Sequence, residues 1–114
     1  MLSLLILYNF AGLGLVALSL PLLYEKIRPN PYYGFRVAAT LSDDRVWYAV
    51  NKYAARRLIA AGLVHVAAAW GLYFVPGLSL DAYALGCLAV FGLAFGVGLW
   101  QSLRFLREYT RKSE

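Results

Sequence analysis

The sequence of 114 residues has little from which a disulfide or a metal site can be built. It holds a single cysteine, Cys87, and a single histidine, His65, so a disulfide within the chain is excluded and a Cys/His metal site is not expected. Paired carboxylates inside an apolar helix and a nucleophile beside its base are missing too. We therefore expect no catalytic residues, no metal and no cofactor, and we favour a protein that is not an enzyme over a membrane enzyme.

Charge is absent from three long windows, residues 1–24, 58–80 and 82–103. Hydrophobic residues make up 61% of the chain and charged residues only 15%, which is more apolar surface than a small soluble domain buries. Each window is at least as long as the roughly 20 residues that a helix needs to cross about 30 Å of hydrocarbon. The sequence predicts one all-α membrane domain, residues 1–114, with three transmembrane helices over about 2–24, 58–76 and 82–103.

The first window also resembles a cleavable signal peptide in its apolar character. Ala17, Leu18 and Ser19 fit a cleavage site, but no lysine or arginine precedes Lys26, and the apolar stretch is longer than a signal peptide requires. A transmembrane helix is the favoured interpretation.

Basic residues are confined to two places. Seven of the eleven lie in the loop 25–57 and four in the tail after Leu103, whereas the N-terminus and the 76–81 connection have none. Short basic loops stay in the cytoplasm, so the N-terminus is predicted outside, and the loop and the C-terminus inside, in a multi-pass membrane protein. The net charge of +5 is better explained by anionic membrane lipids than by nucleic acid, which we do not expect as a partner.

The polar loop carries the turn and cap signals. Pro29 and Pro31 hold the chain extended on either side of Asn30, and Gly34 allows a turn. Ser42 is a predicted N-cap, so a helix is expected from about that residue into the second span. Three aromatic residues of this helix fit an interfacial belt: Trp47, Tyr48 and Tyr53.

A set of loop residues resembles the signature of the SdpI family of small bacterial membrane proteins. The residues that carry the resemblance, in order, are Pro29, Asn30, Gly34, Phe35, Arg36, Thr40, Leu41, Trp47 and Asn51. The sequence departs from the family pattern at Val37, where threonine is usual, and at Ala55, where glycine is frequent. The resemblance implies a plasma-membrane immunity protein that protects a toxin-producing cell, in some systems by also capturing a repressor at the membrane.

The same residues predict a polar cluster at the cytoplasmic mouth of the bundle. Arg36 has five donors and no acceptor, so we expect it to be a buried anchor, with Asn30, Thr40 and Asn51 as hydrogen-bonding partners. Such a cluster either pins the folded loop to the helices or also binds a lipid phosphate, a peptide or a protein segment. Gly34, Phe35 and Trp47 complete this binding or structural cluster.

Two polar residues interrupt the spans. Asn9 is expected to bond a neighbouring helix. His65 follows Asn51 by about 40° on an ideal helix, so both share a face, and packing is favoured over proton transfer because no span contains an acidic partner. Small residues four apart predict close helix approach at 67 and 71 and at 92 and 96, and Gly12 and Gly14 are also expected at close contacts.

Three functions fit these features. The leading one is immunity against a secreted peptide toxin, or signalling, through the loop and the inner helix ends. A second is a small accessory subunit of a larger membrane complex or a homo-oligomer, and a third is a membrane enzyme or transporter with Arg36 as a phosphate anchor.

Overall fold

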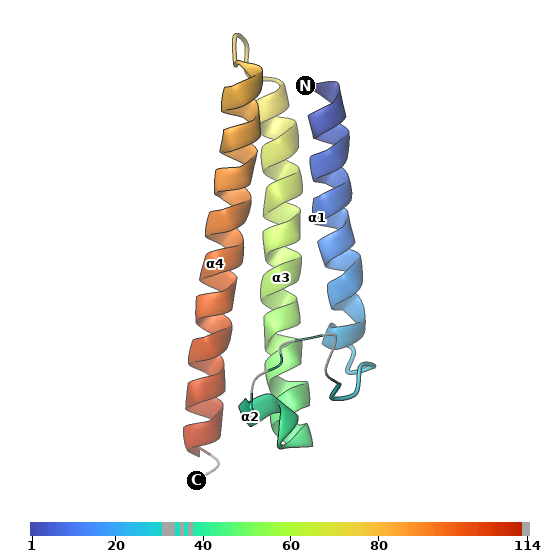
Figure 1. The fold of residues 1–114 in the computed structure, drawn as a ribbon, viewed down its shortest axis with the longest axis vertical. Helices are drawn as coiled ribbons and strands as arrows, with labels where there is room; N and C mark the ends of the chain where they lie inside the picture. Colours follow the sequence, from blue (N-terminus) through green and yellow to red (C-terminus); the bar gives the residue numbers. More distant parts are fainter. Residues whose placement is uncertain (31–33, 35, 37, 113–114) are drawn as a thin grey trace.

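The computed structural model describes residues 1–30, 34, 36 and 38–112, and within these residues the regular structure is entirely helical (Figure 1). The predicted site residue Phe35 lies outside the described residues. The helices are α1 (Leu2–Leu23), α2 (Ala38–Leu41), α3 (Asp44–Tyr73) and α4 (Leu80–Lys112). The molecule is a narrow rod of 56 × 23 × 18 Å.

The three long helices run side by side, with α3 between α1 and α4 (Figure 1). The N-terminus and the α3–α4 connection lie at one end, which we call the turn end. The α1–α3 loop, α2 and the C-terminal end of α4 lie at the other, the loop end. Because successive long helices run in opposite directions, the basic loop and the basic tail lie at the same end of the bundle.

Two of the helices, α1 and α4, are long and apolar enough to cross a membrane. The second predicted span, 58–76, does not pass the same test. Its uncharged window includes the turn after Tyr73, so the helical part from Leu58 covers only about 16 residues, or about 24 Å.

The helix starts differ in detail from the predicted ones. The N-cap of α3 is Asp43, not Ser42, and its carboxylate accepts a hydrogen bond from the Arg45 amide at 2.9 Å. At α4, the hydroxyl of Ser79 accepts from the Ala82 amide at 3.1 Å, and Asp81 lies in the first turn. In both cases the short polar side chain just before the helix satisfies a free amide.

Two tyrosines join the helices at the turn end. The Tyr8 hydroxyl of α1 donates to the Ala84 carbonyl of α4 at 3.1 Å, and the buried Tyr83 hydroxyl donates to the Ala69 carbonyl of α3 at 2.8 Å. Tyr8 and Tyr83 belong to one apolar cluster that also contains Cys87, which is fully buried. The three helices are therefore tied together at this end.

Gly12 of α1 and Gly62 of α3 pack closely against each other. A Cβ atom on Gly12 would lie 2.8 Å from the Gly62 carbonyl oxygen, so only glycine fits without a shift. The predicted contacts at Gly14, Gly71, Gly92 and Gly96 are wrong within this chain, because a Cβ at any of them meets nothing within 4 Å. Spacing alone did not identify which glycines face a neighbour.

Candidate functional site

Trp47 fastens the loop to the bundle. Its side chain is completely buried, and its indole Nε1–H donates to the Ile27 carbonyl oxygen at 2.8 Å. The prediction of an interfacial belt is thus wrong for Trp47, because the chain after α1 folds back and covers the ring. The bond joins residues 20 apart in sequence and holds the start of the loop against α3.

Gly34 packs directly on this tryptophan. Its φ of +107° is a conformation that other residues rarely adopt. A Cβ atom there would also lie 3.1 Å from the Trp47 ring and 2.9 Å from Asn51 Oδ1. Backbone conformation and close packing both require glycine at this signature position.

Asn51 and Thr40 form the buried polar part of the cluster. Asn51 is 2% exposed, and its side-chain amide donates to the Trp47 carbonyl at 3.0 Å. Thr40, in α2, is fully buried where α2 packs on α3. The structure therefore brings Gly34, Trp47 and Asn51 together as predicted neighbours.

Arg36 differs from the expectation, because it is exposed and is not a buried anchor. Asn30 is half-buried, and its amide donates to the nearby Arg28 carbonyl at 2.7 Å. The tryptophan, and not the arginine, occupies the interior beneath the loop. Burying a guanidinium requires several well-placed acceptors, whereas an indole needs one.

A cleft of about 270 Å³ lies beside this cluster, between α1, α3 and α4. Gly34 and Asn51 form its wall next to the loop, and Ala54 and Leu58 continue it along α3. The remaining lining residues are Leu15, Leu18, Ser19, Leu22, Phe95, Leu99 and Ser102. We call this space the inner cleft.

Three buried polar side chains interrupt the apolar lining of the inner cleft. Ser19 and Ser102 are each 1% exposed and donate to the carbonyl four residues earlier in their own helices, both at 2.8 Å. Asn51 donates to its own helix in the same way. Because each hydroxyl proton is bonded within its own helix, the oxygens of Ser19 and Ser102 keep acceptor lone pairs. The inner cleft thus suits an apolar ligand that carries hydrogen-bond donors.

The profile of the SdpI/YfhL protein family matches residues 26–101, which include the whole cluster, α3 and most of α4. The chain belongs to the SdpI/YfhL family. It is also similar to the uncharacterized protein YfhL of Bacillus subtilis (strain 168), with 38% identity over 53 residues, or 46% of this chain and 48% of YfhL. The matched part is thus about half the length of that relative. No solved structure matches the chain.

The sequence of this SdpI-family protein did not identify Ser19 and Ser102 as site residues. Serines are common in apolar helices because they bond their own backbone. Their separation in the sequence does not indicate a shared site, because they lie on α1 and α4 and line the same cleft only in the folded chain. Asn51 was found because it lies inside the family signature.

Asn9 and His65, the two polar residues predicted within the spans, lie closer to the turn end than the cluster does. Asn9 Oδ1 accepts a hydrogen bond from Trp70 Nε1 at 2.8 Å, which joins α1 to α3. His65 is 2% exposed and sits between the rings of Tyr8 and Phe91, at centroid distances of 5.2 and 4.8 Å. Its Nδ1 has no hydrogen-bond partner among the described residues. Neither residue lines the inner cleft.

Proposed function

We propose that this SdpI/YfhL-family protein is a non-enzymatic protein of the bacterial plasma membrane that protects the cell against a secreted apolar peptide toxin. The observation that carries the proposal is the convergence of the family signature, through Gly34 and Asn51, on the wall of the inner cleft. An apolar peptide entering this cleft from the lipid places its side chains against leucines and its amide donors near Ser19 and Ser102.

In the proposed arrangement all three long helices cross the membrane, with the N-terminus outside and the loop end in the cytoplasm. The grouping of the basic loop and the basic tail at one end of the rod supports this orientation. The shorter apolar part of α3 is tolerated because α1 and α4 flank it on both sides. Lipid contact is then largely left to the two more apolar helices.

The inner cleft has a lateral opening suited to a ligand from the bilayer. Leu18 of α1 is 60% exposed and Leu99 of α4 is 36% exposed, although both line the cleft. The hydrogen bonds of Tyr8 and Tyr83 join the helices at the opposite end, which leaves this part of the α1–α4 side open. A peptide in the membrane reaches the cleft without passing through water.

The loop offers a route from the cleft to a cytoplasmic partner. Gly34 touches both the Trp47 ring and Asn51, so a ligand that moves Asn51 also displaces the loop backbone. Signalling through this loop accompanies protection in the proposal.

Survival under toxin challenge tests the proposed function. Cells with and without the gene for this protein are exposed to peptides secreted by neighbouring strains, and the surviving fraction is counted. Protection that depends on the protein supports the proposal, and equal survival against every peptide preparation contradicts it.

A second candidate is an accessory subunit of a larger membrane complex. Gly71, Gly92 and Gly96 are exposed with open space beside them, which is the surface that close helix docking uses. Co-purification of a partner in constant ratio in mild detergent favours this role, and loss of that ratio in Gly92→Leu assigns the contact to α4.

A further inference from the structure

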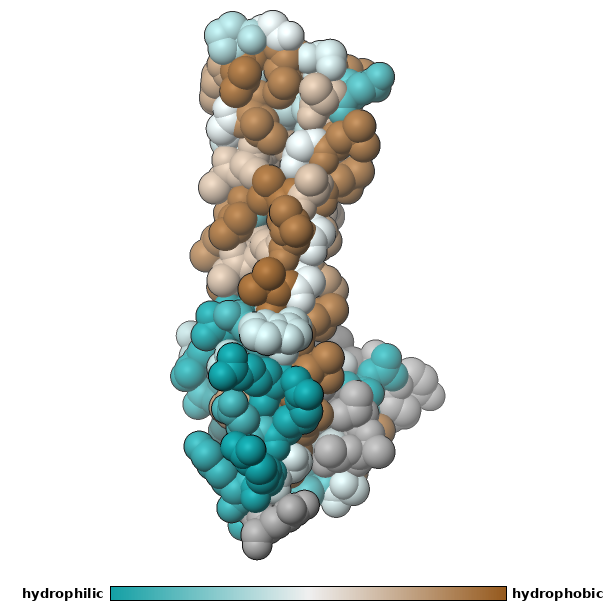
Figure 2. Space-filling model, turned by 90° about the vertical axis from the view of Figure 1, so that its left-hand side faces the viewer, coloured by the Kyte–Doolittle hydropathy of each residue, from teal (hydrophilic) through white to brown (hydrophobic). Residues whose placement is uncertain are grey.

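The cytoplasmic part of α4 carries a basic stripe that the inner cleft does not use. Trp100, Arg104, Arg107 and Arg111 fall within about 60° of one another on a helix of 100° per residue. The buried residues of this part of α4, Gly98, Ser102 and Leu106, lie on the opposite side. Figure 2, which faces α4, shows an apolar surface that changes to a hydrophilic patch toward the loop end.

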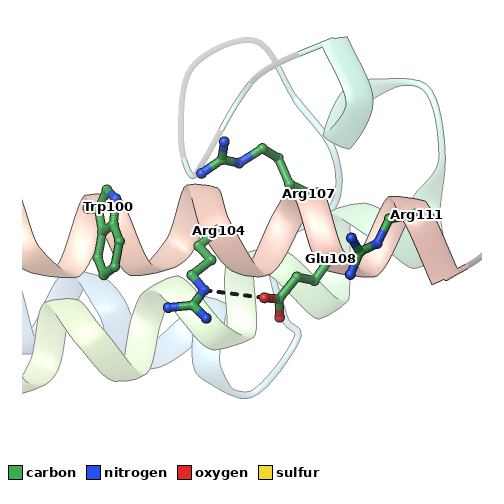
Figure 3. Close-up of a pocket in the computed structure, with 5 residues that line it drawn as sticks. All are labelled: Trp100, Arg104, Arg107, Glu108 and Arg111. Atoms are coloured by element: carbon green, nitrogen blue, oxygen red, sulfur yellow. Dashed lines mark hydrogen bonds and ion pairs between the residues drawn. The ribbon is translucent and has the colours of Figure 1, made fainter.

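The stripe forms a shallow hollow of about 490 Å³, and Glu108 is the remaining lining residue (Figure 3). The Arg104 guanidinium lies 5.7 Å from the centre of the Trp100 ring, and its Nε lies 3.2 Å from Glu108 Oε1. Figure 3 shows Arg104 and Glu108 at one edge of the helix and Arg107 extending to the other. The hollow therefore lies between two arginine side chains.

The charge balance of this hollow favours an anion. Three arginines face one carboxylate, and the bond to Glu108 uses only the Nε–H of Arg104, so its four other N–H donors point elsewhere. Guanidinium groups match the geometry of phosphate oxygens, and a phosphate accepts from several of them at once. The hollow is suited to a phosphate group.

The position along α4 identifies the source of that phosphate. Trp100 is 55% exposed at the end of the apolar run, where indole rings sit at a membrane surface. Arg104 and Arg107 follow by about 6 and 10 Å along the helix axis, at the depth of lipid headgroups. We propose that this stripe binds the phosphate of an anionic phospholipid in the cytoplasmic leaflet. The inference rests on the membrane crossing of α4 in the proposed function, but not on toxin binding.

Lipid selectivity of the reconstituted full-length protein tests the proposal. Spin-labelled phosphatidylglycerol and spin-labelled phosphatidylcholine are added separately to phosphatidylcholine vesicles containing the protein, and electron paramagnetic resonance gives the ratio of their association constants. We expect the ratio to exceed one for the wild type and to fall about twofold to fivefold for each arginine removed in R107Q and R104Q/R107Q. R45Q is the matched control, because Arg45 is an exposed arginine about 20 Å along α3 from Leu58.

Three results overturn this proposal alone. The first is a ratio near one for the inserted wild type, and the second is an equal fall in R45Q and R107Q, which is a general charge effect. In the third, R107Q and R104Q/R107Q keep the wild-type ratio but lose binding of inorganic phosphate measured by isothermal titration calorimetry, which assigns the hollow to free phosphate. Failure of the protein to insert, detected by protease access to both ends of α4, contradicts the proposed membrane arrangement itself and this proposal with it.

Discussion

A Cβ atom built on Gly62 of α3 would lie 2.6 Å from the carbonyl oxygen of Gly12 of α1. The neighbouring atom is backbone, so a side chain cannot move aside to relieve the contact. The Gly12–Gly62 pair therefore sets the distance between α1 and α3, and with it the width of the inner cleft farther along the same two helices.

Gly62→Ala is expected to destabilise the protein by about 1 to 3 kcal/mol, because the added methyl group pushes the helices apart. Unfolding of the purified protein in increasing denaturing detergent measures the change. Gly14→Ala is the matched control: it lies on the same helix as Gly12 but has open space around it, so it should be neutral or stabilising by up to about 1 kcal/mol. Equal destabilisation by both variants would contradict the close contact.

Gly34→Ala should lower stability more than Gly77→Ala. Both glycines have positive φ, +107° and +74°, so both substitutions strain the backbone by about 1 to 2 kcal/mol. Only Gly34 faces the Trp47 ring and Asn51, and this clash adds about 1 to 3 kcal/mol. The same denaturation measurement compares the two variants, and a larger loss in Gly77→Ala would show that the loop does not pack on Trp47.

Arg36→Ala and Arg36→Lys should each change the free energy of unfolding by no more than about 0.5 kcal/mol, because the side chain is exposed. Thermal stability in detergent measures this effect, and cell survival under toxin challenge is measured beside it. Lost protection with unchanged stability would identify Arg36 as a binding residue. A stability loss of several kcal/mol would show that Arg36 is a buried anchor after all.

Single introduced cysteines test the membrane orientation in a background where Cys87 is replaced. Val75→Cys, at the turn end, should react with an impermeant reagent in intact cells, and Arg45→Cys should react only after permeabilisation. Both positions are exposed, so access to the reagent is governed by the membrane. The reverse labelling pattern would place the signature loop outside the cell.

The helices followed from composition and local signals. Apolar windows located α1 and α4, and the cap signal at Ser42 placed Trp47 and Asn51 on a helix. The length of the second span was misjudged, since absence of charge does not distinguish a helix from the uncharged turn after Tyr73.

The details of the site depended on tertiary contacts that a single sequence does not specify. Trp47 is an aromatic residue near the end of a predicted span, as belt residues are, but its indole bonds to the Ile27 carbonyl and its side chain is buried. Arg36 was expected inside because its five donors call for several acceptors, but a charged group is less costly to leave in water. Gly12 of α1 packs on Gly62 of α3, and the spacing of small residues within one helix does not indicate which residue of another helix they contact.

Filling the inner cleft is the most direct test of the central claim that this cleft receives the toxin. Ala54→Leu places extra carbon atoms in the cleft, and Ala67→Leu adds the same atoms at an exposed position of the same helix. The measurement is the survival of cells expressing each variant at equal membrane level, under the peptide challenge that the wild type resists. The account predicts that Ala54→Leu loses protection while Ala67→Leu retains it, and full protection by Ala54→Leu would contradict it.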